Sequence, residues 1–299
     1  MRPRFTWQIG RRTVALGERT LVMGIVNVTP DSFSDGGQFF DRGDAVNHAL
    51  RLLDEGADIV DVGGESTRPG ASVNVAEGHA RKSPVTAEEE LARVIPVITE
   101  IRRLRPDSII SVDTYKAFVA KAAVESGADI VNDVSGFQWD PDMPSTCADL
   151  DCGLVLMHMR GLPETWRSLS KLEDPLTLVK HELGLVVKKA EEEGIARERV
   201  VLDPGFGFGK SFEENYPLLA GLNKLADLGF PLLAGTSRKS FVGRAVGLPK
   251  ETPASDRLAG SLAAMVISIM KGAHIVRVHD VKQSLEGARV ADAILHSAC

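Results

Sequence analysis

The chain has 299 residues, of which 43% are hydrophobic and 25% charged, values typical of a protein with a substantial hydrophobic core. This composition excludes intrinsic disorder and a collagen-like structure. Lys and Arg number 35 against 41 Asp and Glu, so the formal net charge is −6. A net acidic chain argues against a general nucleic-acid binder. The length is compatible with two domains or with one large barrel.

Neither a membrane span nor a secretory signal is expected. The longest apolar stretch, residues 258–270, is interrupted by glycine and serine and is shorter than the roughly 20 residues that cross a bilayer. Basic residues near the N-terminus interrupt the apolar core that a signal would need. Cys147, Cys152 and Cys299 form no CxxC pair, which is more typical of reduced thiols than of a disulfide framework. We therefore expect a cytoplasmic protein.

Short β-rich runs alternate with helix-length amphipathic stretches, a pattern that predicts a parallel sheet with helical crossovers. Eight such runs match the (β/α)8 TIM barrel, whose usual size of about 250 residues fits residues 21–299. The predicted strands are 21–28, 59–65, 109–113, 130–134, 154–158, 200–204, 231–235 and 275–279. The predicted helices include 44–55, 86–104 (with a capping box at Thr86 and Glu89), 116–126, 175–193 and 258–271. The fold class is therefore α/β, with a single barrel domain.

Residues 1–20 precede the first barrel strand. Within them, residues 5–9 and 13–15 flank a Gly-Arg-Arg turn, which predicts a short N-terminal hairpin. We expect this hairpin to close the bottom of the barrel. Residues 72–83 are polar and lack periodicity, so they should form a loop on the active face, after the second strand.

Polar and charged residues follow nearly every predicted strand. In a TIM barrel, the carboxyl ends of the strands and the loops after them form the active site. A hydrophobic strand usually ends in small turn residues, so acids, amides and bases after so many strands indicate a function. In chain order these candidates are Asn27, Glu65, Thr67, Arg68, Asp113, Asn132, Asp133, His158, Asp203, Ser237, Arg238, Lys239, Arg277 and His279.

The acidic and amide candidates point to a nitrogen heterocycle. Asp113, Asn132 and Asp203 should reach the barrel mouth from strands three, four and six, where they could hydrogen-bond the edge of a flat ring. For Asp113 the alternative is a cap on the following helix.

The basic candidates imply an anionic substrate. Lys239, Arg277 and His279 lie on strands seven and eight, in the region where barrels often build a phosphate site with help from a helix N-terminus. For Arg238 the alternative is a solvated basic turn. Asn27 precedes a Gly- and Ser-rich loop and offers an amide oxygen for Mg²⁺ beside a diphosphate.

Several other chemistries are excluded by spacing. Residues 203–210, DPGFGFGK, fit neither the GxGxxG nor the GxxxxGK[ST] pattern of nucleotide sites. No Ser-His-Asp or Cys-His arrangement and no compact zinc cluster can be assembled from the predicted strand ends. His158 and His279 stand apart, and each is expected to donate a hydrogen bond rather than bind a metal.

Two long segments, MGIVNVTPDSFSDGG at 23–37 and DVGGESTRPG at 61–70, resemble the signature segments of the dihydropteroate synthase family. Later segments follow that family in the same order, and the resemblance covers about residue 21 to the C-terminus. These segments are SVDT at 111–114, NDVSG at 132–136, MHM at 157–159, DPGFGFGK at 203–210, SRKS at 237–240 and RVHD at 277–280.

The resemblance implies that dihydropterin diphosphate and 4-aminobenzoate condense to dihydropteroate and diphosphate in folate synthesis, with Mg²⁺ as cofactor and sulfonamides as inhibitors. It assigns the pterin to Asp113, Asn132, Met157, Asp203, Phe208, Gly235 and Lys239. It assigns the diphosphate end to Asn27 (through Mg²⁺), Arg277, His279, Thr67 and Arg68. The aminobenzoate is expected between Phe33 and Pro69, with its carboxylate at Ser240. The resemblance further implies a homodimer formed through late helices.

The mechanism we expect is an SN1-like displacement, in which electrostatic stabilisation of the leaving diphosphate carries the barrier. Loops at 29–37 and from residue 67 would close over the cationic pterin and exclude water. Two alternatives stay open. A pterin-binding methyltransferase barrel would pass a methyl group to a corrinoid partner, but it has little need for Lys239, Arg277 and His279 together. A non-catalytic pterin binder would not require Asn27 and the other residues of the diphosphate end.

Overall fold

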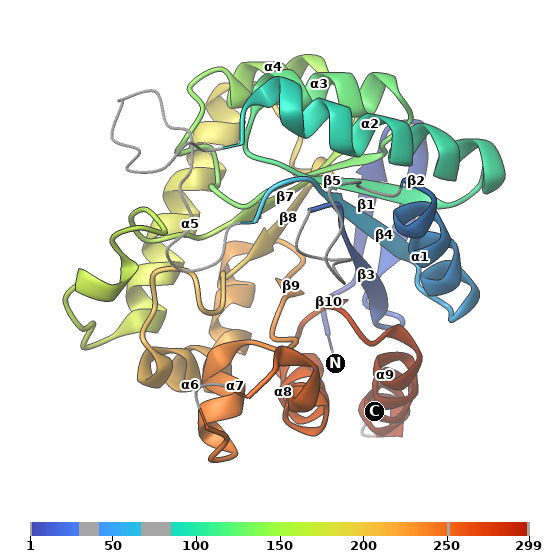
Figure 1. Ribbon diagram of the computed structural model, residues 1–299. Coiled ribbons are helices and arrows are strands. Elements are labelled where there is room, and N and C mark those ends of the chain that lie inside the picture. The colour runs from blue at the N-terminus through green and yellow to red at the C-terminus, as the bar shows by residue number, and fades with distance from the viewer. Residues whose placement is uncertain (1, 30–41, 67–84, 250–251, 298–299) are drawn as a thin grey trace.

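The computed structural model describes residues 2–29, 42–66, 85–249 and 252–297. Eight parallel strands form one curled sheet, and helices surround it (Figure 1). The barrel strands are β3 (Leu21–Asn27), β4 (Ile59–Gly63), β5 (Ile109–Asp113), β6 (Ile130–Asp133), β7 (Gly153–Met157), β8 (Val200–Asp203), β9 (Leu233–Ala234) and β10 (Ile275–Val278). Their order is β8-β7-β6-β5-β4-β3-β10-β9, and a parallel bridge between Leu202 and Leu232 brings the two edges together. The predicted TIM barrel is therefore confirmed.

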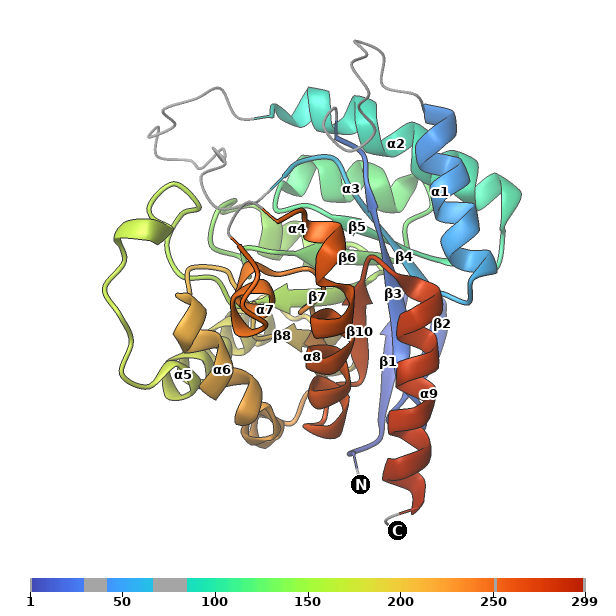
Figure 2. The same ribbon diagram turned by 60° about the horizontal axis from the view of Figure 1, so that its bottom comes forward.

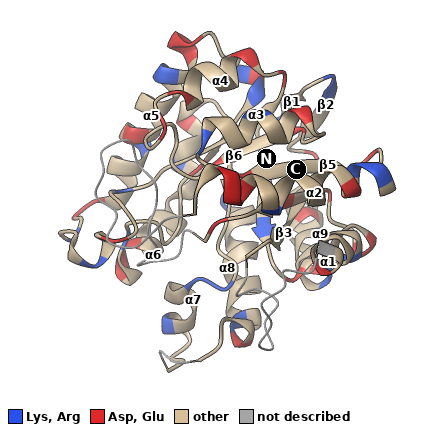
Figure 3. Ribbon diagram, turned by 45° about the horizontal axis from the view of Figure 1, so that its top comes forward, with Lys and Arg blue, Asp and Glu red and all other residues tan. Residues whose placement is uncertain are grey.

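The helices lie outside this sheet, and within the described ranges none is long and apolar enough to cross a membrane. They are α1 (Arg42–Asp54), α2 (Ala87–Leu104), α3 (Ala117–Glu125), α4 (Met143–Asp149), α5 (Pro175–Glu192), α6 (Phe212–Ala220), α7 (Ser240–Ala245), α8 (Leu258–Met270) and α9 (Val281–Ser297). The expected capping box is present, because the Glu89 amide donates to the Thr86 hydroxyl and the Thr86 amide donates to Glu89. Figure 3 shows acidic and basic residues interspersed along these helices.

Strand alternation produces two separate hydrophobic clusters. On β4, Val60 and Val62 face outward and pack in the larger cluster beneath the helices. Ile59 faces inward and packs in a smaller cluster inside the barrel. Because Ile59, Asp61 and Gly63 alternate with the two valines, Asp61 also faces the barrel interior.

One predicted strand is much shorter in the structure. Residues 231–235 were expected to form a strand, but β9 contains only Leu233 and Ala234. Pro231 has no backbone N–H to donate to a neighbouring strand. After Ala234 the chain leaves the sheet toward the functional site.

The N-terminal hairpin is formed by β1 (Phe5–Ile9) and β2 (Arg12–Leu16), which pair antiparallel. Trp7, Ile9 and Leu16 are buried in the cluster that also contains the first residues of several barrel strands. The Trp7 indole donates to the backbone oxygen of Arg199, which precedes β8. The hairpin therefore packs against the amino-terminal ends of the strands.

The N-terminus is tied to the last helix. Arg2 donates to the hydroxyl of Thr20 at 2.7 Å and to the carboxylate of Asp292 on α9 at 2.5 Å. Asp292 also accepts from the Thr20 amide at 2.7 Å. This buried network explains why the two ends of the chain lie side by side in Figures 1 and 2.

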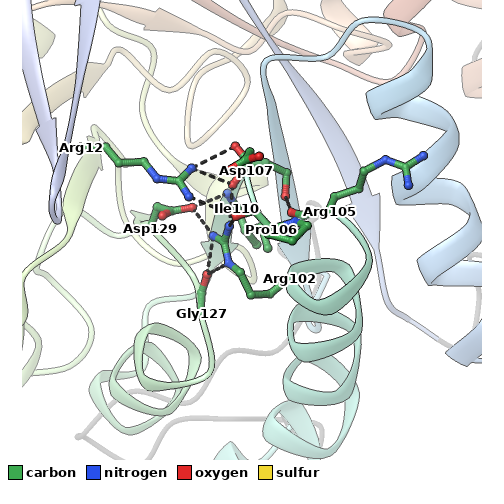
Figure 4. Close-up of polar contacts among 9 residues, drawn as sticks. Arg12, Arg102, Arg105, Pro106, Asp107, Ile110, Gly127 and Asp129 are labelled. Carbon is green, nitrogen blue, oxygen red and sulfur yellow. Dashed lines mark hydrogen bonds and ion pairs between the residues drawn. The ribbon is translucent and has the colours of Figure 1, made fainter.

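Arg102, near the end of α2, joins the loops at the amino-terminal ends of β5 and β6 (Figure 4). Its guanidinium donates to the backbone oxygens of Pro106, Ser108 and Gly127 and to the carboxylate of Asp129, at 2.5–3.1 Å. Arg12, from the hairpin, donates to the same Pro106–Ser108 turn. Two arginines therefore donate hydrogen bonds to backbone oxygens of these loops, which are not paired in a strand ladder.

Replacing Arg102 by methionine is expected to lower the free energy of unfolding by about 2–3 kcal/mol, since it leaves partly buried acceptors without donors. Urea denaturation would measure this change. The carboxyl-terminal face of the barrel should be unchanged, because Arg102 lies at the amino-terminal ends of the strands. Arg103→Met is the matched control, because Arg103 forms only an exposed pair with Glu100 and should change stability little. Equal stability of the two variants would contradict the prediction.

Candidate active site

A cavity of about 340 Å³ opens at the carboxyl ends of the barrel strands. The strand register sets this site, because Asn27, Gly63, Asp113 and Asn132 lie side by side on four neighbouring strands. Fourteen of the residues singled out from the sequence line the cavity: Asn27, Glu65, Asp113, Asn132, Met157, Asp203, Phe208, Gly235, Ser237, Arg238, Lys239, Ser240, Arg277 and His279. Four others, Phe33, Thr67, Arg68 and Pro69, lie outside the described residues, as does the loop at 72–83.

A buried group of charged residues surrounds Arg277. The Nε atom of Arg277 lies 2.6 Å from Asp61 Oδ2, and its Nη2 atom lies 2.5 Å from Asp113 Oδ2. Asn132 donates its side-chain amide to the same Asp61 oxygen at 3.1 Å. Asp61 is completely buried, and its Oδ1 atom has no hydrogen-bond partner within the described ranges. Asp61 therefore fixes the orientation of one cation and one amide at the cavity wall.

Asp61 was missed among the sequence candidates because it lies in the middle of a strand rather than at its end. The available signal was its position in Ile-Val-Asp-Val-Gly, where an acid alternates with two outward-facing valines. In a closed barrel such a position points into the interior. A carboxylate there needs a partner.

Asp113 does not cap the following helix, which was the alternative considered for it. The first amide of α3, at Ala117, is bonded instead by Asp140 at 2.8 Å. Arg277 was assigned to the diphosphate by resemblance, and that role stays a prediction. The structure adds that two carboxylates already hold its guanidinium.

The electrostatics of the cavity follow from its burial. Desolvation raises the pKa of Asp113 to about 7 against the opposing effect of Arg277, and it raises the pKa of Asp203 to about 6. Burial acts to lower the pKa of Arg277, but Asp61 and Asp113 more than offset it, so the net pKa is raised. The site therefore combines a permanent cation with acids that titrate near neutral pH.

An aromatic and cationic wall faces these acids. The Lys239 ammonium lies 3.8 Å from the centroid of the Phe208 ring, and Trp166 packs edge to face on that ring at 5.4 Å. Phe208 lies in a segment whose glycines at 205, 207 and 209 all have positive φ. A Cβ atom on Gly205 would collide with the backbone oxygen of His158. Position 205 must therefore be glycine for this segment to lie against the end of β7. Trp166 lines the cavity and was not predicted.

Two other candidates have structural partners. Arg238 forms two bonds with Asp280, at 2.5 and 3.0 Å, which link the chain after β9 to the start of α9. The alternative of a solvated turn is therefore wrong for Arg238, although its φ of 57° does mark a turn. Asp133 accepts bonds from the amides of Ser135 and Phe137 and so stabilises the turn after β6.

Glu65 lines the cavity beside a buried lysine. Lys116 donates to Glu65 and to Glu90 on α2, each at 2.5 Å. Burial raises the pKa of Glu65 against the effect of Lys116. His279 contacts the Ser237 hydroxyl through Nδ1 at 3.0 Å. Lys116 thus fixes the orientation of the Glu65 side chain, and Ser237 fixes that of His279.

Comparisons with known proteins identify the family of this chain. A family described as "Pterin binding enzyme" matches residues 23–279. Dihydropteroate synthase of Clostridium beijerinckii is 44% identical, over 96% of this chain and 99% of its own length. The structure of Xanthomonas albilineans dihydropteroate synthase with 4-aminobenzoic acid superposes with a TM-score of 0.85 and 42% identity, covering 99% of both chains. The same enzyme with 7,8-dihydropteroate gives a TM-score of 0.82 and 40% identity, covering 98% of this chain and 99% of that one. This chain therefore belongs to the dihydropteroate synthase family of pterin-binding enzymes.

Proposed function

We propose that this chain condenses 6-hydroxymethyl-7,8-dihydropterin diphosphate with 4-aminobenzoate, giving 7,8-dihydropteroate and diphosphate in folate synthesis. The observation that carries this proposal is the buried group of Asp61, Asp113, Asn132 and Arg277 at one wall of the cavity. It offers a heterocycle both acceptors and donors in fixed positions. A TIM barrel alone would support many other activities, so the function rests on these residues and on the full-length relatives.

The pterin should bind between the carboxylates and the aromatic wall. Its amino-pyrimidine edge carries N–H groups, which can donate hydrogen bonds to the carboxylates of Asp113 and Asp203. Lys239 can donate to a ring acceptor while its ammonium stays on the face of Phe208. Met157 supplies a soft apolar contact for the ring.

The bond that breaks is the one between the pterin methylene carbon and the bridging diphosphate oxygen, which keeps the electron pair. The methylene gains cationic character, and the amine nitrogen of 4-aminobenzoate then attacks it and loses a proton. Arg277 and His279 would stabilise the charge of the diphosphate, and Thr67 and Arg68 are assigned to the same end. Loops carrying Phe33 and Pro69 would exclude water, with the aminobenzoate carboxylate at Ser240.

Mg²⁺ is part of this proposal. Asn27 lines the cavity and offers one amide oxygen, a ligand type that Mg²⁺ accepts. The described residues contain no group of three or more His, Cys, Asp or Glu side chains suited to a metal. At this site Mg²⁺ would be held by Asn27, the substrate phosphates and water. When bound, the ion would offset the negative charge of the departing diphosphate.

We also propose a homodimer formed through the late helices. Ile267 and Met270 on α8 and Val290 and Ile294 on α9 are large apolar side chains that are exposed. Each pair is spaced for one helix face, and α8 and α9 are neighbours. A cytoplasmic location completes the proposal, since the buried Cys147 and Cys152 are free thiols.

The direct test is to incubate the purified protein with dihydropterin diphosphate, 4-aminobenzoate and Mg²⁺ and to follow dihydropteroate formation. The parent should form product, and Arg277→Ala should be slower by a factor of about 1000, because it removes the cation that we assign to the leaving diphosphate. Circular dichroism would confirm that the variant is folded. Bound pterin without product from the parent would favour the binder or methyltransferase alternative.

A further inference from the structure

Trp166, Phe208 and Lys239 form one wall of the cavity, here called the pterin wall. Behind it lies a chain of three side chains, two of them buried, that the proposed mechanism does not use. Lys210 Nζ lies 2.8 Å from His158 Nδ1, and His158 Nε2 lies 2.7 Å from Glu182 Oε2. Lys210 and His158 are buried, whereas the Glu182 side chain is 36% exposed on the outer helix α5. The chain of contacts thus runs from the interior to the protein surface.

The ammonium of Lys210 gathers three backbone oxygens. It lies 2.8 Å from the oxygen of Gly205, 3.1 Å from that of Phe208 and 3.5 Å from that of His158. These oxygens converge because the left-handed glycines fold the segment back on itself beside β7. A cation at their centre offsets the repulsion between them.

This cation is coupled directly to the cavity through Phe208. The backbone oxygen of Phe208 binds Lys210, and its ring contacts Lys239 and Trp166 in the cavity wall. A change in the charge of Lys210 must therefore act on the segment that positions the ring.

We propose that Lys210 is a positioning residue for the pterin wall and that His158 transmits to it the charge of Glu182 on the outer face of α5. The proposal rests on the proposed function only in naming the pterin as the ligand. According to this proposal, Lys210 does not contact the substrate. It holds the wall that does.

The protonation states agree with this arrangement. Burial lowers the pKa of His158 to about 4, so at neutral pH its Nδ1 accepts from Lys210 and its Nε2–H donates to Glu182. Burial also lowers the pKa of Lys210 to about 7. The charged groups that act on Lys210 are Asp203, Glu182 and Glu214, which favour its cation, and Lys239, which opposes it. Lys210 is therefore charged below about pH 7 and loses its charge above it.

The test compares Glu182→Gln with Glu191→Gln, a control on the same helix whose carboxylate pairs with Arg197 instead. The readout is Trp166 fluorescence in the ligand-free protein, obtained by subtracting the signal of a Trp166→Phe variant. It reports the position of the pterin wall, because Trp166 contacts the Phe208 ring. We expect a transition near pH 7 in the parent and in Glu191→Gln. In Glu182→Gln it should move at least about half a pH unit lower, because the carboxylate no longer favours the Lys210 cation.

A second measurement links the wall to binding. At pH 8, Glu182→Gln should weaken affinity for the free pterin about threefold or more, as measured by calorimetry, and at pH 5.5 it should match the parent. Coincident fluorescence titrations of Glu182→Gln and Glu191→Gln would overturn the proposal. Since that readout needs neither substrate nor turnover, it stays decisive even if the protein lacks synthase activity, and parent pterin binding tests the function separately.

Discussion

Asp61→Asn is expected to lower kcat/KM for dihydropterin diphosphate by about 100-fold or more. The carboxylate accepts from both Arg277 and Asn132, and removing one charge of a buried pair costs about 3–5 kcal/mol. Part of this free energy should appear as a lower stability. The rest should appear as lower activity, because Arg277 and Asn132 at the cavity wall lose their orientation. Steady-state kinetics with each substrate varied, together with thermal melts, would separate the two effects.

Ser111→Ala is the matched control for Asp61→Asn. Ser111 lies beside Asp61 on the neighbouring strand, and its buried hydroxyl has no hydrogen-bond partner within the described part of the chain. Removing this hydroxyl should leave both activity and stability close to those of the parent. If Asp61→Asn were as active as Ser111→Ala, Asp61 would have no part in orienting Arg277.

Asp203→Asn is expected to stabilise the fold at pH 8 while weakening pterin binding. Burial raises the pKa of Asp203 to about 6 in the folded protein, above the ordinary aspartate pKa of about 3.9. The folded state therefore binds the proton more tightly, so the parent loses stability as pH rises from about 4 to 6 and the full cost is present above pH 6. A difference of about 2 pKa units corresponds to about 3 kcal/mol, which asparagine removes.

The same substitution removes a charged acceptor for the pterin, so affinity should fall about 10- to 100-fold. Urea denaturation at pH 8 and pH 4 and calorimetry with the pterin would test both halves of the prediction. The gain in stability should vanish at pH 4, where the parent carboxyl is also neutral. A variant that is less stable than the parent at pH 8 would show that Asp203 is favourably paired in the folded state.

The candidate site was largely predictable because a TIM barrel gathers its strand ends on one face. Asn27, Asp113 and Arg277 are far apart in the sequence, yet Asn27 and Asp113 end their strands and Arg277 lies one residue before the end of β10. Their meeting in one cavity follows from the topology once eight strands are recognised. The roles of Phe33, Thr67, Arg68 and Pro69 stay predictions, since these residues lie outside the described ranges.

The groups that support the site were not predictable in the same way. Asp61 lies mid-strand, Trp166 begins a short 3-10 helix (Trp166–Ser168) between β7 and α5, and Lys210 follows a glycine segment that matches no nucleotide motif. Their importance comes from contacts with residues distant in the chain, such as Lys210 with His158. Local sequence patterns report which way a side chain faces, but they do not report which buried groups it meets.

The brevity of β9 has a consequence for how the barrel moves. Its ladder with β10 covers only two residue pairs, and only the Leu202–Leu232 bridge pairs this part of the ring with β8 in the described part of the chain, whereas β3 and β4 pair over five residues. This seam should open most often in the native state, and its amides should exchange with deuterium faster than those of β3 and β4. Because Asp203 and Gly235 lie beside the seam and line the cavity, such breathing would widen the pterin side first.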